Sequence, residues 1–278
     1  MTAVPVSGGE LAVRTHAGST EPVLAIHGLS SNCRLWNWVR ADSPELSLIA
    51  PDLRGRAASA SVTGTSSVDQ HVADMIAVLD HAGVERATVC GMSMGAFVAV
   101  AMATAHPDRV RSAVLVDGGL PMDRGMTEEQ IRAAFSAAEA DLAQHHFPTP
   151  EDYAEHLAPA LPLVDRTDPL LLDHLGHDLA DGRVQHDAAA IVDDAVDTLL
   201  GPSRWKELSR PARLVFAEWG VGEGSAPAYT SEAVAEFAAE LPHLQHTELI
   251  PGTDHASTIM TPRGAAVVAA NIRAALES

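Results

Sequence analysis

Gly91-Met92-Ser93-Met94-Gly95 is the stretch that decides the fold of this chain. It follows a short apolar run at residues 87–90 (Ala-Thr-Val-Cys) and precedes a run of small apolar residues at 96–103. This order predicts a buried strand, a tight turn that carries the serine, and a helix. A serine in such a turn has strained backbone angles, and the flanking glycines let strand and helix approach closely. The stretch therefore predicts a nucleophile elbow, in which the Ser93 hydroxyl points away from the chain.

A serine nucleophile needs hydrogen-bond donors for the oxyanion that forms when it attacks a carbonyl. Residues 22–26 (Pro-Val-Leu-Ala-Ile) are typical of a buried strand, which runs into His27-Gly28-Leu29. The backbone N–H groups of Leu29 and of Met94, the residue after the nucleophile, are the expected donors. Met94 also opens the predicted helix, so the helix dipole adds to the stabilisation.

Three side chains close to these groups are candidates for lining a substrate pocket: His27, Trp36 and Met92. Each also has a structural interpretation. The His27 ring can hydrogen-bond nearby backbone, Trp36 can pack against the loop that carries His27-Gly28-Leu29, and Met92 can pack in the core. For His27 the structural role is favoured over direct chemistry.

The candidate general base lies near the other end of the chain. Residues 247–250 (Thr-Glu-Leu-Ile) are typical of a last strand, which leads into Gly252-Thr253-Asp254-His255. A histidine in a glycine-containing loop after the final strand can meet a serine at the same edge of a sheet. The chain has 14 histidines, so it is the position of His255, not its residue type, that makes it the candidate.

Four motifs in this order resemble those of the α/β-hydrolase superfamily: His27-Gly28, Asp52-Leu53-Arg54-Gly55, residues 91–95 and residues 252–255. The resemblance covers nearly the whole chain. It implies an α/β fold with a mostly parallel eight-stranded sheet and helices on both faces. It also implies a Ser–His–acid triad at the carboxyl ends of the strands, built from Ser93, His255 and an acid that lies between them in the chain.

The acid has three candidates. Asp117 follows the apolar run at 113–116 and precedes two glycines, and it is favoured because an acid at this strand end can reach the second nitrogen of a histidine. In many members of the superfamily the acid follows the next strand, but the aspartate of that pattern corresponds to Gly220 here. Glu218 and Glu223 remain as alternatives close to that position.

The domain organisation is predicted to be one core with one insertion. The core is expected to comprise residues 1–118 and 207–278, and residues 119–206 are expected to form a helical cap with no convincing strand. Such a cap would exclude water and shape the pocket. In the turn at 52–56, Arg54 and Arg56 are expected to stabilise the loop through ion pairs.

Composition limits the partners. The net charge of −19 argues against nucleic acid and against an anionic membrane. Cys33 and Cys90 do not make a disulfide scaffold, and the first residues carry no signal peptide or membrane span, so a cytoplasmic protein is expected. The histidines of the cap have no metal-ligand spacing, and neither a metal nor an organic cofactor is expected. The oligomeric state is not readable from the sequence.

These features predict a serine hydrolase that cleaves an ester, lactone or thioester of a small to medium apolar metabolite through an acyl-enzyme. Two alternatives use the same fold, which does not fix the reaction. One is another reaction at the same site, either hydrolysis of a carbon–carbon bond or cofactor-free perhydrolysis. The other is a non-catalytic ligand-binding protein.

Overall fold

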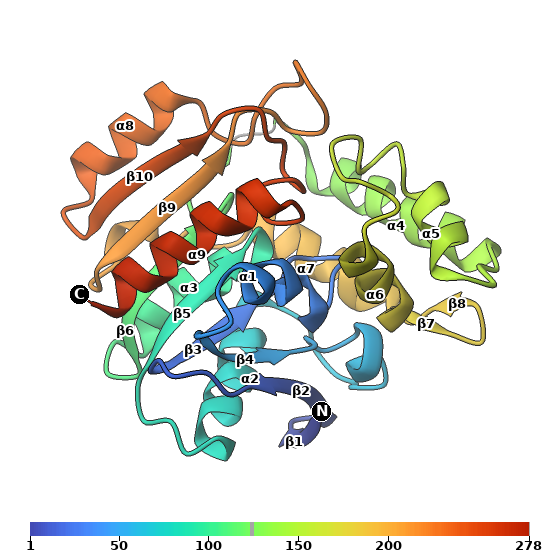
Figure 1. Ribbon diagram of the computed structural model, residues 1–278, viewed down its shortest axis with the longest axis horizontal. Helices are drawn as coiled ribbons and strands as arrows, with labels where there is room; N and C mark the ends of the chain where they lie inside the picture. The colour runs from blue at the N-terminus through green and yellow to red at the C-terminus, as the bar shows by residue number, and fades with distance from the viewer. Residues whose placement is uncertain (123–124, 278) are drawn as a thin grey trace.

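The computed structural model describes residues 1–122 and 125–277; residues 123 and 124, within the expected cap, and the final residue of the expected core lie outside it. Its main feature is an eight-stranded sheet with the order β1-β2-β4-β3-β5-β6-β9-β10 (Figure 1). β1 and β2 pair antiparallel, as do β2 and β4, and all other neighbours are parallel. The strands are β1 (Thr2–Val6), β2 (Gly9–His16), β3 (Pro22–Ile26), β4 (Ser47–Pro51), β5 (Ala87–Met92), β6 (Val110–Val116), β9 (Ala212–Ala217) and β10 (Leu244–Ile250).

Helices cover both faces of this sheet. In β3, Leu24 and Ile26 belong to one apolar cluster while Val23 and Ala25 belong to another, because successive side chains of a strand point to opposite faces. The first cluster includes residues of α2 (Val68–His81), α3 (Met94–Ala105) and α8 (Ser231–Glu240). The second includes residues of α1 (Asn37–Asp42) and α9 (Pro262–Leu276). The predicted α/β fold, with its mostly parallel eight-stranded sheet and helices on both faces, is thus confirmed.

The segment between β6 and β9 is mainly helical; α4, α5 and α6 lie together at one side of the molecule, and α7 lies nearer its middle (Figure 1). α4 (Glu128–Gln144) packs on α7 (Ala188–Leu200), and α5 (Pro150–His156) packs on α6 (Pro169–His177). Threonine hydroxyls cap the N-termini of α4 and α5: the side chains of Thr127 and Thr149 each accept a hydrogen bond from the backbone N–H three residues later. Whether this segment closes over the site as a cap remains a prediction.

The expectation that residues 119–206 contain no strand is wrong. β7 (Leu179–Ala180) and β8 (Arg183–Val184) form a small antiparallel hairpin. Asp181 and Gly182 connect them with φ values of 48° and 69°, the left-handed conformation that tight hairpin turns require. Strands of two residues show no alternation of apolar and polar side chains, so the Asp-Gly pair was the only local signal.

A buried network of charges joins α7 to the core. Arg56 Nη1 lies 2.6 Å from Asp194 Oδ2, and the two side chains are 0% and 1% exposed. The same oxygen accepts hydrogen bonds from His71 Nε2 (2.9 Å) and Ser66 Oγ (2.8 Å). Burial alone would raise the pKa of Asp194, but His71, Arg56 and Ser66 together lower it to about 2. Together with the pairing of Arg54 and Asp74 at 2.8 Å, this confirms that both arginines of the turn form ion pairs.

Replacing Asp194 with alanine is expected to lower the free energy of unfolding by about 3–5 kcal/mol, because Arg56 would be left buried and without a counter-charge. Urea unfolding at neutral pH measures this. Asp193→Ala on the same helix is the control, since the Asp193 side chain is 52% exposed and pairs with Arg132 at the surface. Equal, small losses for both variants would show that the buried network contributes little.

Candidate active site

Ser93 lies in a tight turn between β5 and α3. Its φ and ψ of 54° and −121° are strained for a residue with a side chain. The glycines on either side are required by the close approach of backbone. A Cβ on Gly91 would lie 2.0 Å from the Gly95 carbonyl oxygen, and one on Gly95 would lie 2.2 Å from the Ile26 carbonyl oxygen. The strand–turn–helix arrangement predicted for this stretch is therefore the one the chain adopts.

The end of β6 lies directly against this turn. Ser93 N donates to Val116 O at 2.9 Å. A Cβ on Gly118 would lie 2.3 Å from the Ser93 carbonyl oxygen, so the two backbones are in contact. Asp117 lies between Val116 and Gly118, and its φ of 44° makes it a second residue with a strained backbone. The nucleophile and Asp117 are thus held on adjacent strand ends by backbone contacts.

Asp117 is hydrogen-bonded to His255 across 138 positions of sequence. His255 Nδ1 lies 2.5 Å from Asp117 Oδ2. The other carboxylate oxygen accepts the N–H of Ala217 at 3.1 Å, so the carboxylate is fixed from two sides. Asp117 is 1% exposed, whereas the His255 side chain is 35% exposed. An imidazole that donates from Nδ1 presents Nε2 as an acceptor for a proton.

The other acid candidates are engaged elsewhere or lie at the surface. Glu218 is exposed, and its Oε2 accepts the N–H of Gly252 at 2.6 Å. It therefore braces the loop that carries His255 without contacting the imidazole through this bond. Glu223 is exposed in the loop after β9. Of the three candidates, Asp117 is the one that the structure brings within hydrogen-bond distance of His255.

The first of the two expected oxyanion donors is oriented by His27. Leu53 N donates to His27 Nε2 at 2.9 Å, so Nδ1 carries the proton and donates to Gly28 O at 2.7 Å. The Gly28 carbonyl and the Leu29 N–H belong to one trans peptide and point in opposite directions. His27 therefore turns the Leu29 N–H away from its own ring. The carbonyl of Leu29 itself is also held, because Arg56 Nε donates to Leu29 O at 2.9 Å.

Both expected donors flank the nucleophile. A Cβ on Gly28 would lie 3.2 Å from Ser93 Cβ, which places the Gly28–Leu29 peptide beside the serine. Met94 is the first residue of α3, where backbone N–H groups have no acceptor within the helix. Their direction toward a substrate oxygen remains a prediction.

The three side chains considered for pocket lining are all buried: His27 is 0% exposed, Trp36 1% and Met92 5%. Burial also lowers the pKa of His27 to about 3, and the ring stays neutral. Trp36 and Met92 belong to the apolar cluster on the α1 and α9 face of the sheet. Both side chains therefore pack in the core, and a role in lining a substrate pocket remains a prediction.

Two groups of described residues combine metal-ligand residue types: Cys33, Asp52 and His177, and Asp141, His145 and His156. Hydrogen bonds account for the first, because His177 Nε2 lies 2.8 Å from one oxygen of Asp52 and Cys33 N donates to the other at 2.8 Å. Burial and the neighbouring Asp52 raise the pKa of the Cys33 thiol far above its usual value, which disfavours the thiolate that a metal needs. This group links α6 to the loop after β4.

Asp178, which follows α6, is buried against the loop after β3. Asn32 Nδ2 donates to its Oδ1 at 2.8 Å, and burial raises the pKa of Asp178 to about 6. In the unfolded chain this carboxyl titrates near pH 4. Between these values only the folded state holds the proton, so the contribution of Asp178 to stability falls as the pH rises from about 4 to 6.

Replacing Asp178 with asparagine is therefore expected to raise the free energy of unfolding above pH 7 by up to about 3 kcal/mol, at 1.4 kcal/mol per pKa unit. At pH 4 the gain should vanish, because the native carboxyl is already protonated. Urea unfolding at both pH values measures the difference, with exposed Asp108→Asn as the control. An equal gain at both pH values would contradict the titration of Asp178.

Comparison with known proteins supports the α/β-hydrolase fold. A family model described as alpha/beta hydrolase fold matches residues 21–152. Lipase LipV of Mycobacterium tuberculosis is 33% identical over 115 residues, which are 41% of this chain and 44% of that protein. The 3-oxoadipate enol-lactonase 2 of Acinetobacter baylyi is 25% identical over 239 residues, 85% of this chain and 82% of the lactonase. The chain spans less than half the length of the first curated relatives it matches.

Solved structures share the fold over the whole chain. The crystal structure of E-2-(acetamidomethylene)succinate hydrolase superposes with a TM-score of 0.79 and 21% identity, covering 100% of this chain and 99% of that one. At this identity the likeness shows the fold. Within the described residues, no helix is both long and apolar enough to cross a membrane.

Proposed function

This chain belongs to the α/β-hydrolase superfamily, and we propose that it is a serine hydrolase that cleaves an ester, lactone or thioester of an apolar metabolite. Ser93 is the nucleophile, His255 the general base and acid, and Asp117 the carboxylate that orients His255. Similarity to a lipase and to an enol-lactonase supports acyl transfer to water as the reaction class. The reaction needs a small-molecule substrate and water, and the proposal calls for no metal or organic cofactor.

In the first half of the reaction, Ser93 Oγ attacks the carbonyl carbon while His255 Nε2 takes the hydroxyl proton. A C–O bond forms, and the carbonyl electron pair moves to the oxygen. The N–H groups of Leu29 and Met94 stabilise this oxyanion. As the tetrahedral intermediate collapses, the bond to the leaving group breaks. The leaving alcohol or thiol takes the proton from the His255 imidazolium.

Water then attacks the acyl-enzyme by the same route in reverse. His255 Nε2 takes one proton from the water, and the hydroxide oxygen bonds to the acyl carbon. Collapse of the second intermediate breaks the bond to Ser93 Oγ, which recovers its proton from His255. Asp117 stabilises the imidazolium in both halves and keeps its negative charge throughout. The products are a carboxylic acid and the alcohol or thiol, or a hydroxy acid from a lactone.

The observation that carries the proposal is the 2.5 Å contact between His255 Nδ1 and Asp117 Oδ2, made next to a serine with positive φ. A buried carboxylate against one imidazole nitrogen fixes the tautomer that a general base needs. Ser93 itself is not fully buried, so its hydroxyl can be reached.

Labelling with a fluorophosphonate tests this proposal. The probe is expected to add once to the native protein, and peptide mass spectrometry is expected to find the adduct on Ser93. Ser93→Ala should remove the label, and Ser136→Ala, at an exposed position of α4, should keep it. A folded native protein that takes no label would instead support a non-catalytic ligand-binding role.

A further inference from the structure

Three side chains of metal-ligand type meet where α4 and α5 end. Asp141 lies in the last turn of α4, His145 is the residue that caps the C-terminus of α4, and His156 is the last residue of α5. One ring nitrogen of each histidine and one carboxylate oxygen of Asp141 all lie within 4.8 Å of one another. His156 Nε2 lies 2.9 Å from Asp141 Oδ2, and His145 Nδ1 lies 3.7 Å from Asp141 Oδ1. The three side chains therefore converge at the ends of two different helices.

A buried aromatic ring holds both imidazoles in place. Phe147 is 4% exposed and stacks on His145, with ring centroids 5.8 Å apart and an angle of 11° between the ring planes. The Phe147 ring also contacts the His156 ring at 5.1 Å, and the two imidazoles lie 4.5 Å apart. Phe147 is itself fixed, because its N–H donates to Gly182 O at 2.7 Å. The imidazoles are thus brought together by packing, which lowers the cost of ordering them around a ligand.

The C-terminus of α4 favours a cation. A helix carries a partial negative charge at this end, where a carboxylate is unfavourable. Residues 141–144 are Asp-Leu-Ala-Gln, so the last turn of α4 adds the negative charge of Asp141 to that of the helix end. A bound cation would offset both charges. A local conflict of this kind is expected at functional sites.

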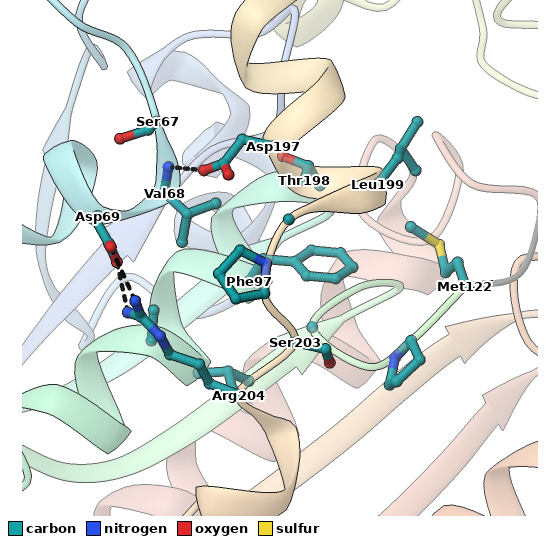
Figure 2. Close-up of a pocket in the computed structure, with 16 residues that line it drawn as sticks. Ser67, Val68, Asp69, Phe97, Met122, Asp197, Thr198, Leu199, Ser203 and Arg204 are labelled. Atoms are coloured by element: carbon teal, nitrogen blue, oxygen red, sulfur yellow. Dashed lines mark hydrogen bonds and ion pairs between the residues drawn. The ribbon is translucent and has the colours of Figure 1, made fainter. Parts of the chain in front are cut away.

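The acids that line a cavity beside α3 differ in this respect. The cavity of about 260 Å³ is lined by residues of α2, α3 and α7, including Asp69 and Asp197. Arg204 Nη2 lies 2.9 Å from Asp69 Oδ2, and Asp197 Oδ2 accepts the N–H of Val68 at 2.8 Å (Figure 2). These partners cannot themselves bind a metal ion. The partners of Asp141 are imidazoles, which can carry the proton on one nitrogen and offer the lone pair of the other to an ion.

The donor atoms select the ion. Two imidazoles and a carboxylate suit Zn²⁺, whereas Ca²⁺ and Mg²⁺ prefer oxygen ligands. With bonds of about 2.0–2.1 Å, the ligand atoms of a tetrahedral zinc ion lie about 3.3 Å apart, so the present spacing requires movements of about 1 Å. The side chains of Asp141 and His145 are 55% and 46% exposed, which leaves them room for this adjustment. A water molecule would complete the four ligands.

We propose that Asp141, His145 and His156 bind one zinc ion, which joins the end of α4 to the end of α5. Because α4 packs on α7 and α5 packs on α6, the ion would connect two helix pairs of the segment between β6 and β9. No metal was expected from the sequence, because the histidines of this segment lack a ligand spacing. The site instead combines two residues one helical turn apart with a histidine of the next helix, which only the fold brings together.

Isothermal titration of Zn²⁺ into metal-free protein without a histidine tag tests this site. The native protein is expected to bind one equivalent. Asp141→Asn keeps the size of the side chain and removes its charge, and His156→Ala removes a ligand. Each change should weaken zinc binding by at least the about 10- to 100-fold that loss of an outer-shell partner costs. Asp108→Asn and His243→Ala, at exposed positions of the core, are the matched controls and should bind zinc as the native protein does.

Stability and hydrogen exchange test whether the ion joins the helices. Saturating Zn²⁺ should raise the midpoint of urea unfolding for the native protein and not for Asp141→Asn. It should also slow exchange of backbone N–H groups at the ends of both α4 and α5. Because Asp141 is exposed, Asp141→Asn should fold, and circular dichroism checks this. None of these readouts requires turnover, so they do not depend on the proposed hydrolase activity.

Three results would overturn the zinc site. The first is a native protein that takes up no zinc. The second is equal zinc affinity in the native protein, Asp141→Asn and His156→Ala. The third is bound zinc that leaves exchange unchanged at either helix end.

Discussion

Replacing Ser93 with alanine is expected to lower kcat for p-nitrophenyl ester hydrolysis by about 10⁵- to 10⁶-fold. In the proposed mechanism the hydroxyl oxygen is the atom that bonds to the substrate carbon, and alanine has no substitute for it. The remaining rate should come from the oxyanion donors and from binding, which still favour attack by water. Single-turnover kinetics should also lose the burst of p-nitrophenol that marks the acyl-enzyme.

The fold should survive this substitution, because alanine occupies the same backbone position and keeps the strained φ of 54°. Circular dichroism and the midpoint of urea unfolding check this point. Ser136→Ala provides the matched control and should keep full activity. A loss smaller than about 100-fold in folded Ser93→Ala would mean that another group carries the attack.

Asp117→Asn is expected to lower kcat by about 10⁴-fold. An asparagine amide can donate to His255 Nδ1 where the carboxylate accepts, which favours the imidazole tautomer with its proton on Nε2. That tautomer cannot take the proton of Ser93. The imidazolium that forms during the reaction would also lose its buried counter-charge. Since neither effect removes a contact with bound substrate, KM should change much less than kcat.

Glu218→Gln is the informative comparison for this variant. Glu218 accepts the N–H of Gly252 at 2.6 Å, and glutamine can accept the same hydrogen bond. Its kcat should stay within about threefold of the native value. A large loss in Glu218→Gln together with a small one in Asp117→Asn would move the acid of the triad to the loop after β9.

Local sequence was enough to predict the elbow and the central strands, while the eight-stranded sheet followed from the resemblance to the α/β-hydrolase superfamily. The glycines at 91 and 95 are needed because backbone passes within contact distance of both, and apolar runs mark the central strands. The choice of acid was harder, because it depends on which carboxylate reaches His255 from 138 positions away. Sequence reasoning favoured Asp117 but kept Glu218 and Glu223 open. The structure adds a distance that sequence spacing cannot supply.

Other features had no usable sequence signal. Phe97 and Leu199 line a cavity, yet apolar residues on a helix have the same spacing whether they face a core or a hollow. The arginines of the turn at 52–56 were expected to form ion pairs, but their partners were not identifiable. Asp194 follows Arg56 by 138 positions, and its neighbour Asp193 is exposed. Only packing distinguishes these two adjacent aspartates.

The link through Arg56 limits how this protein can be redesigned. One guanidinium donates to the Leu29 carbonyl in the core and pairs with Asp194 on α7. The segment between β6 and β9 is therefore not an interchangeable module, although it is inserted at a single point. A chimera that takes this segment from a relative without an equivalent carboxylate would leave the buried Arg56 charge unpaired, beside the peptide expected to bind the oxyanion. A segment transferred to change specificity must therefore keep an aspartate at the position of Asp194, or Arg56 must be replaced at the same time.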